Sequence, residues 1–322
     1  MRTWRASARG ARPRDRRESP LRKHLLALLA AACATPGVRA ADVTVLNDDA
    51  HFAEGPVWYH GQLYYVEYDR NSVTTWDGAR NHTFWSKPGC GPSAVIPTAR
   101  GEFLTTCYDS GTLGHIAADG RDLPPYSHDK DGHPFVGPND FAPDRRGGIY
   151  FTCSGTAPGP VIDGKVFYLA ADGSITQEAT DVHSANGIVV SNDGKILYVI
   201  ETEDNRLIQF QIAADASLSE RRVFLNLDEL THHVTHIYPD GVKMDSRGLL
   251  YIGQNPRDLK APLAGVIFVV DATGKLLRTL QLPSPGVPNL ALSPDEKTLY
   301  VMALDQLDKP PYAGKVYAIA NR

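Results

Sequence analysis

The sequence predicts an all-β fold, a six-bladed β-propeller that occupies residues 41–322. Beyond residue 41, short stretches of alternating apolar and polar residues are separated by turns rich in Gly, Asp and Asn, a pattern typical of strands. One two-strand unit recurs six times, with copies 36, 46, 47, 54 and 49 residues apart. Repeats of about 40–50 residues built from several strands indicate propeller blades.

The clearest copy of this unit covers residues 238–253. A turn and a first strand occupy residues 238–245, a second turn occupies 246–248, and a second strand occupies 249–253. The six copies open their first strands at Pro56, Pro92, Pro138, Ala185, Pro239 and Pro288. Six repeats in phase argue against the alternative folds, a β-sandwich or a pair of barrels.

A third strand follows in most copies, and residues 42–46 are expected to supply the outer strand of the last blade. That strand would close the ring, which otherwise leaves unpaired strand edges. The predicted third strands are Ser72–Trp76, Gly111–Ala117, Lys165–Leu169, Arg206–Gln211, Gly265–Val270 and Gly314–Ala318.

Residues 1–40 differ in composition from the rest and are predicted to be a cleaved signal peptide. A basic run ends at Arg22-Lys23, and the apolar run that follows, residues 25–34, is short for a transmembrane helix. We expect cleavage after Ala40 and export to the periplasm or the exterior. Three alternatives stay open: a disordered basic tail, a twin-arginine signal at residues 16–17, and lipid attachment at Cys33.

Removal of residues 1–40 makes the chain strongly acidic. The whole sequence has 33 basic and 37 acidic residues, and residues 1–40 hold ten of the basic and two of the acidic ones. The remainder has 23 basic and 35 acidic residues, so the net charge changes from −4 to −12. An acidic surface argues against nucleic-acid binding.

Three cysteines lie beyond residue 40: Cys90, Cys107 and Cys153. An odd number excludes complete pairing within one chain. We expect a disulfide between Cys90 and Cys107, because they are closest in sequence, and such a bond suits an oxidising compartment. Cys153 is expected to be a buried packing residue rather than a reactive thiol. No CxxC spacing occurs, which argues against a thiolate zinc site.

Polar residues begin the first strand of every repeat. In a propeller these strands line the central channel, so the residues should gather at one mouth: Glu54, Ser93, Asn139 with Asp140, Asn186, Asp240 and Asn289. Any one alone is explained by turn chemistry. Together, carboxylate and amide oxygens suit Ca²⁺, Mg²⁺ or Mn²⁺, and two carboxylates in a partly dry cavity would repel each other without a cation. The sequence therefore predicts a central metal site.

The repeats and their motifs resemble the senescence marker protein/gluconolactonase/luciferin-regenerating enzyme family of six-bladed propellers. The resemblance covers nearly all of residues 42–322 and rests on residues 54–58, 138–140, 185–187 with 191–195, 201–206 and 239–241. It implies that Glu54, Asn186 and Asp240 hold one divalent cation. We expect Ca²⁺, with Zn²⁺, Mg²⁺ and Mn²⁺ as alternatives. The resemblance also implies that Asp240 is the general base and that Asn139 meets the substrate or completes the metal shell.

The activity implied by this resemblance is metal-dependent opening of sugar lactones, as in a gluconolactonase. A metal-bound water and a neighbouring carboxylate suffice for ester hydrolysis, and the sequence contains no GxSxG nucleophile elbow. Hydrolysis of other lactones, esters or organophosphates is the alternative, as is a non-catalytic binding propeller. We expect a monomer that acts on a small lactone, without a transmembrane segment after cleavage.

Asp140 and His236 are two further candidates for substrate binding. Asp140 follows Asn139 directly, and His236 lies four residues before Asp240. The neighbouring His232 and His233 are interpreted as parts of a solvated loop. The family often carries an acidic residue at the position of Cys153, so the substrate preference stays open.

Overall fold

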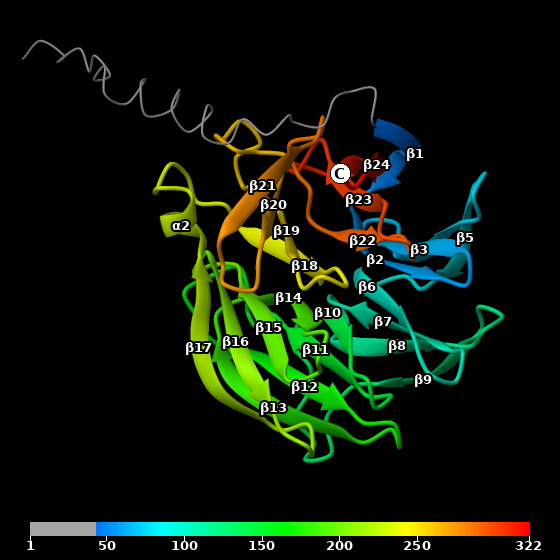
Figure 1. Ribbon diagram of the computed structural model, residues 1–322. Helices are drawn as coiled ribbons and strands as arrows, with labels where there is room; N and C mark the ends of the chain where they lie inside the picture. The colour runs from blue at the N-terminus through cyan, green and yellow to red at the C-terminus, as the bar shows by residue number, and fades with distance from the viewer. Residues whose placement is uncertain (1–42) are drawn as a thin grey trace, which may run out of the picture. The chain divides into compact units, whose positions relative to one another are not determined.

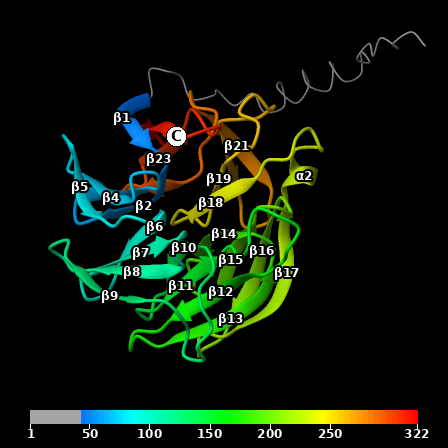
Figure 2. The same ribbon diagram turned by 180° about the vertical axis from the view of Figure 1, so that it is seen from behind.

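The computed structural model describes residues 43–322, which form six four-stranded antiparallel sheets arranged as the blades of a propeller (Figure 1). The predicted signal peptide, residues 1–40, lies outside the described residues. In five blades the strands follow one another from the centre outward, and the view from behind shows the same order (Figure 2). This confirms the predicted fold.

The blades have the following strands. The first has β2 (Ala53–Tyr59), β3 (Gln62–Glu67), β4 (Ser72–Trp76) and β5 (Asn81–Ser86), and the second has β6 (Pro92–Pro97), β7 (Phe103–Cys107), β8 (Thr112–Ile116) and β9 (Asp122–Tyr126). The third has β10 (Pro138–Pro143), β11 (Ile149–Cys153), β12 (Gly164–Leu169) and β13 (Ile175–Val182). The fourth has β14 (Ala185–Val190), β15 (Ile196–Glu201), β16 (Arg206–Ile212) and β17 (Leu218–Asn226), and the fifth has β18 (Pro239–Met244), β19 (Leu250–Gln254), β20 (Val266–Val270) and β21 (Leu276–Gln281).

The sixth blade joins the two ends of the described chain. Its inner strands are β22 (Leu290–Leu292), β23 (Thr298–Leu304) and β24 (Ala313–Ala320), and its outer strand is β1 (Val43–His51). β1 pairs with β24 in antiparallel register, with Thr44 opposite Ala318. The predicted closure of the ring by the first strand is therefore confirmed, and the edge of β24 is paired.

The hydrophobic core lies between neighbouring blades. Each blade is packed on both faces, so the middle strands are buried along their whole length, as in β20. Phe135, Phe151 and Phe167 show how this space is filled, with ring centroids 5.1–5.2 Å apart. This packing holds the inner strands in place around the channel.

Two smaller features complete the architecture. The helix found within residues 43–322 is α2 (Leu227–Leu230), which Asn226 caps through its side chain. Cys90 and Cys107 form the predicted disulfide, and Cys153 is free and buried, as expected. Within the same described range, no helix has the length and apolar character needed to cross a membrane.

Candidate metal centre and active site

A cavity of about 500 Å³ opens at the mouth of the channel where the inner strands begin. Five neighbouring blades each contribute the second residue of their inner strand to its lining: Glu54, Ser93, Asn139, Asn186 and Asp240. The structure therefore brings together residues that are up to 186 positions apart in the sequence. In the sixth blade, Asn289 directly precedes β22, and its Nδ2 donates to Glu54 Oε2 at 3.0 Å.

Glycines directly after the predicted ligands allow the inner strands to approach one another closely. A Cβ atom on Gly187 would lie 2.3 Å from the backbone oxygen of Asp240, and one on Gly241 would lie 2.3 Å from Cγ of Asn289. The pairing of the inner and second strands also shifts register here, between Ala185 and Ile188 and between Pro239 and Val242. Such bulges re-aim side chains, and here they occur directly at the cavity.

Threonine hydroxyls tie three of the inner strands, β10, β14 and β18, to the blade before each of them. Thr106 Oγ1 donates to the carbonyl of Asn139 at 2.8 Å, and Thr152 Oγ1 donates to that of Asn186 at 2.7 Å. Thr202 Oγ1 donates to the carbonyl of Pro239 at 2.8 Å and also lies 3.2 Å from Asn186 Nδ2, from which it accepts. These bonds fix the backbone of Asn139, Asn186 and Pro239 and orient the amide of Asn186.

A second set of cavity residues was not predicted from the sequence. It consists of the first residue after the second strand of each of five blades: Tyr68, Tyr108, Ser154, Thr202 and Asn255. The backbone N–H of each donates to the carbonyl of the residue that precedes the inner strand of the same blade. Alignment of the repeats at the ends of their second strands would have shown this set, because the position is the same in every copy.

Burial of two carboxyl groups dominates the electrostatics of the cavity. Glu54 and Asp240 are each 7% exposed. Burial, together with the nearby Asp240 carboxylate, raises the pKa of Glu54 well above its ordinary value. Burial also raises the pKa of Asp240 to about 7; the Asp140 charge adds to the rise, whereas the amides of Asn186 and Asn255 oppose it. Two buried acids that disfavour each other's ionisation are stabilised by a cation.

The oxygen atoms of the cavity fit a divalent cation. Glu54 uses Oε2 to accept hydrogen bonds from Gly55 N and Asn289, so its other oxygen has no protein partner among the described residues. Asn186 directs Nδ2 to Thr202, and no group among residues 43–322 donates a hydrogen bond to its amide oxygen. Asn255 Oδ1 is buried and has no hydrogen-bond partner in the described part of the chain. Carboxylate and amide oxygens of this kind are the ligands that hard cations prefer.

Two of the predicted substrate-binding residues do not line this cavity. Asp140 lines a second cavity of about 450 Å³, formed farther along the inner strands, and its carboxylate lies 3.2 Å from Lys243 Nζ. His236 packs against Tyr238, with ring centroids 4.2 Å apart, and its buried Nε2 has no hydrogen-bond partner within residues 43–322. Of the substrate-binding predictions, Asn139 is the residue that the structure places in the central cavity.

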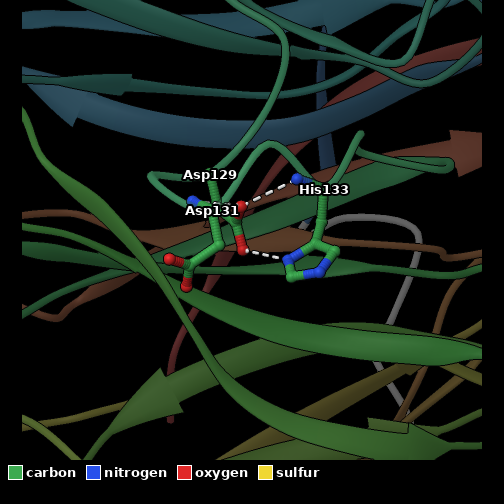
Figure 3. Close-up of side chains that lie close together, drawn as sticks. All are labelled: Asp129, Asp131 and His133. Carbon is green, nitrogen blue, oxygen red and sulfur yellow. Dashed lines mark hydrogen bonds and ion pairs between the residues drawn. The ribbon is translucent and has the colours of Figure 1, made fainter.

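A separate group of possible ligands lies in the loop between β9 and β10. Asp129, Asp131 and His133 place their ligand atoms within 4.8 Å of one another (Figure 3). The buried Asp129 carboxylate already accepts hydrogen bonds from the backbone N–H groups of Asp131 and His133 and lies 2.9 Å from His133 Nδ1. These hydrogen bonds hold the loop in place, which explains why the three side chains lie together. None of the three lines the central cavity.

Known proteins share both the sequence pattern and the fold. Pentonolactonase XacC from Haloferax volcanii is 25% identical over 264 residues, which cover 80% of this chain and 83% of that protein. A gluconolactonase from Xanthomonas campestris superposes with a TM-score of 0.70 at 21% identity, covering 90% of this chain and 92% of its own. A calcium-binding regucalcin from Agrobacterium tumefaciens superposes with a TM-score of 0.67 at 18% identity, covering 85% and 92%. At these identities the two structures establish a shared fold.

A protein-family model also matches most of this chain. The model described as the SMP-30/Gluconolactonase/LRE-like region matches residues 52–305, from the residue before β2 to the residue after β23. The matched range contains every residue of the central cavity that begins an inner strand. This chain belongs to the SMP-30/gluconolactonase/LRE-like family.

Proposed function

We propose that this protein is a metal-dependent lactone hydrolase whose single divalent cation is held by Glu54, Asn186 and Asp240. The observation that carries the proposal is the pair of buried acids, Glu54 and Asp240, beside the free amide oxygen of Asn186. Among the described residues that line the cavity, the cationic side chain is Arg257, which is ion-paired with Glu203. The charge of the two acids is therefore left for a bound cation to balance.

In the proposed hydrolysis, each residue around the cavity has a separate role. A bound divalent cation would supply Lewis-acid polarisation of the lactone carbonyl and lower the pKa of a water molecule. Asp240 would accept a proton from the attacking water, because its carboxylate lines the cavity beside the proposed cation site and a carboxylate can act as a general base. Thr202 orients Asn186, Asn289 orients Glu54, and Asn139 has its side chain in the cavity to meet the substrate.

The choice of metal, the class of substrate, export and the oligomeric state are proposed from the relatives of this chain and from its sequence. Ca²⁺ is the first choice of metal, since the three proposed ligands offer oxygen atoms and a calcium-binding regucalcin shares the fold. Lactones are the proposed substrates because pentonolactonase XacC is a relative, and sugar lactones are the first class to test. Export stays a prediction, and the Cys90–Cys107 disulfide supports it. The monomeric state also stays a prediction.

Metal depletion is the central test. The protein is stripped with EDTA, and hydrolysis of a panel of sugar and other lactones is measured after Ca²⁺, Mg²⁺, Mn²⁺ or Zn²⁺ is restored. We expect no turnover without metal and recovery with at least one of the four ions. Full activity of the stripped protein would contradict the proposal. Metal binding without turnover of any lactone, ester or phosphotriester would favour a non-catalytic binding propeller.

A pair of variants tests whether the metal binds in the central cavity or at the group formed by Asp129, Asp131 and His133, called the loop group. Asp240→Ala should abolish both lactone hydrolysis and metal binding measured by calorimetry. His133→Ala removes a possible ligand of the loop group and serves as the matched control, because His133 lies outside the cavity. If His133→Ala loses the catalytic metal and Asp240→Ala retains it, the metal site lies in the loop and not in the central cavity.

A further inference from the structure

Five blades share one backbone conformation at the residue directly before the inner strand. This residue has a positive φ in each of them: Phe52 (51°), Gly91 (56°), Gly137 (60°), Ser184 (55°) and Tyr238 (55°). Glycine adopts this left-handed conformation without steric cost, whereas a bulky side chain does so rarely. Aromatic residues at two of the five positions are therefore an unfavourable choice for the backbone, and such strain concentrates at functional sites.

Both aromatic residues lie beside the predicted metal ligands and line the cavity. Phe52 is two residues before Glu54, and Tyr238 is two residues before Asp240. Two further rings that line the cavity surround Phe52: its ring centroid lies 5.5 Å from that of Tyr68 and 5.8 Å from that of Tyr312. These three half-buried residues form what we call the aromatic wall: Phe52, Tyr68 and Tyr312.

Tyr238, which precedes the inner strand of the fifth blade, lines the same cavity in a different setting. The Arg257 guanidinium lies 4.6 Å from the centroid of the Tyr238 ring and is ion-paired with Glu203. Arg257 is therefore already neutralised by a protein carboxylate. An anionic substituent would have to compete with Glu203 for it, so the mouth favours a neutral ligand.

Several hydroxyl groups around the cavity are already engaged by protein acceptors. Tyr68 donates to Asp109 Oδ1 at 2.8 Å, Ser154 donates to the carbonyl of Ala185 at 2.8 Å, and Thr202 donates to that of Pro239. A polyhydroxylated ligand needs many free donors and acceptors, because each hydroxyl group that is desolvated without a partner costs binding energy. An apolar substituent needs only surface to cover, which the aromatic wall supplies.

We propose that the preferred substrate is a neutral lactone with an aromatic or hydrocarbon substituent, which packs on the aromatic wall while the lactone group lies at Asp240. The lactone part of this inference rests on the proposed function, whereas the substituent rests on Phe52, Tyr68 and Tyr312. The inference departs from the sugar lactones expected from the sequence, so one panel of substrates tests both.

The test compares γ-lactones that share one ring: γ-butyrolactone, γ-phenyl-γ-butyrolactone and D-xylono-1,4-lactone. We expect kcat/KM for the phenyl lactone to exceed that for γ-butyrolactone by about tenfold or more, the scale of one aromatic contact with its buried area. The xylonolactone should be the poorest of the three. A preference for the xylonolactone would overturn the inference and leave the lactone hydrolase intact.

Variants at the two ends of strand β2 supply the matched comparison. Phe52→Gly removes the ring and relaxes the left-handed backbone, so it should fold and lose most of the preference for the phenyl lactone. His60→Gly makes the same change at the far end of β2, where His60 has a φ of 46° and lies outside the cavity, and should keep the preference. Phe52→Leu, which removes only the ring, is the substitute if Phe52→Gly does not fold. An unchanged preference after loss of the ring would contradict the proposal.

A non-hydrolysable lactam separates this inference from the proposed function. 5-Phenyl-2-pyrrolidinone should bind to the metal-loaded wild type more tightly than 2-pyrrolidinone in calorimetry, and Phe52→Gly should abolish the difference. If no lactone is hydrolysed but this result is obtained, the aromatic recognition stands and the hydrolase proposal fails. Equal binding of the two lactams would overturn the recognition.

Discussion

Asn289 donates a hydrogen bond of 3.0 Å to the Glu54 carboxylate across 235 positions of sequence. This contact joins the start of the sixth blade to the start of the first, at the mouth of the channel. It couples closure of the ring to the orientation of a predicted metal ligand.

Asn289→Ala should weaken metal binding by about tenfold or more, because a hydrogen bond to a charged group contributes roughly 1.5–3 kcal/mol. Calorimetric titration of the EDTA-stripped protein measures this. Asn192→Ala is the control: its Nδ2 donates to the Asp245 carbonyl at 2.8 Å and also joins two blades, but away from the cavity. Equal losses of metal affinity in both variants would show that Asn289 acts only through overall stability.

The metal-free protein should lose stability as the pH rises. The pKa of Asp240 is raised from 3.8 to about 7 in the folded state, so the stabilisation is fully present below about pH 4 and is lost as the pH passes 7. Between pH 5 and pH 8 the loss from this group is on the order of 3 kcal/mol, and Glu54 acts in the same direction. Urea unfolding in EDTA at pH 5 and pH 8 measures it. Asp240→Asn should flatten the dependence, and an unchanged slope would argue against burial as its cause.

Thr202→Val should lower both stability and metal affinity. The hydroxyl holds the Pro239 carbonyl and orients Asn186, so its loss should cost about 1–2 kcal/mol of unfolding free energy and weaken metal binding. Thr106→Val removes the equivalent link to the Asn139 carbonyl and is the matched control, because its hydroxyl orients none of the three proposed metal ligands, Glu54, Asn186 and Asp240. The two variants should unfold alike but differ in calorimetric metal affinity. Identical metal affinities would mean that Asn186 needs no such support.

Lys243→Met should destabilise the protein by about 3–5 kcal/mol, since it leaves the buried Asp140 carboxylate without its partner. The double variant Asp140→Asn/Lys243→Met should recover most of this loss in urea unfolding. The same double variant tests the predicted substrate contact of Asp140. If Asp140 only supports the channel, KM for the lactone should stay within about twofold of wild type, a change of under 0.5 kcal/mol. A large rise in KM would restore Asp140 as a binding residue.

Loss of the Cys90–Cys107 disulfide should lower the free energy of unfolding by about 3 kcal/mol, because the bond closes a loop 17 residues long. Cys90→Ser/Cys107→Ser is compared with the wild type by urea unfolding with and without a reductant. The reductant should destabilise the wild type and leave the variant unchanged. A variant as stable as the wild type would show that packing of β6 against β7 suffices.

Local pattern was enough to predict the fold and the position of the candidate ligands. Alternation and turn residues are local properties, and their sixfold recurrence defines both the blades and the residues that open each inner strand. Ring closure by the first strand also followed from sequence, since an open propeller leaves an unpaired edge. Glu54, Asn139, Asn186 and Asp240 could therefore be placed at one mouth.

Only the tertiary structure decided which neighbours share that mouth. Asn139 and Asp140 are adjacent in one strand, and successive side chains of a strand point in opposite directions. Asn139 therefore enters the cavity, while Asp140 turns toward Lys243 farther along the channel. The aromatic wall was equally hidden, because its members come from three separate turns and Phe52 enters the cavity through a left-handed backbone. Sequence determined the repeating unit, whereas the packing of the blades determined which side chains meet.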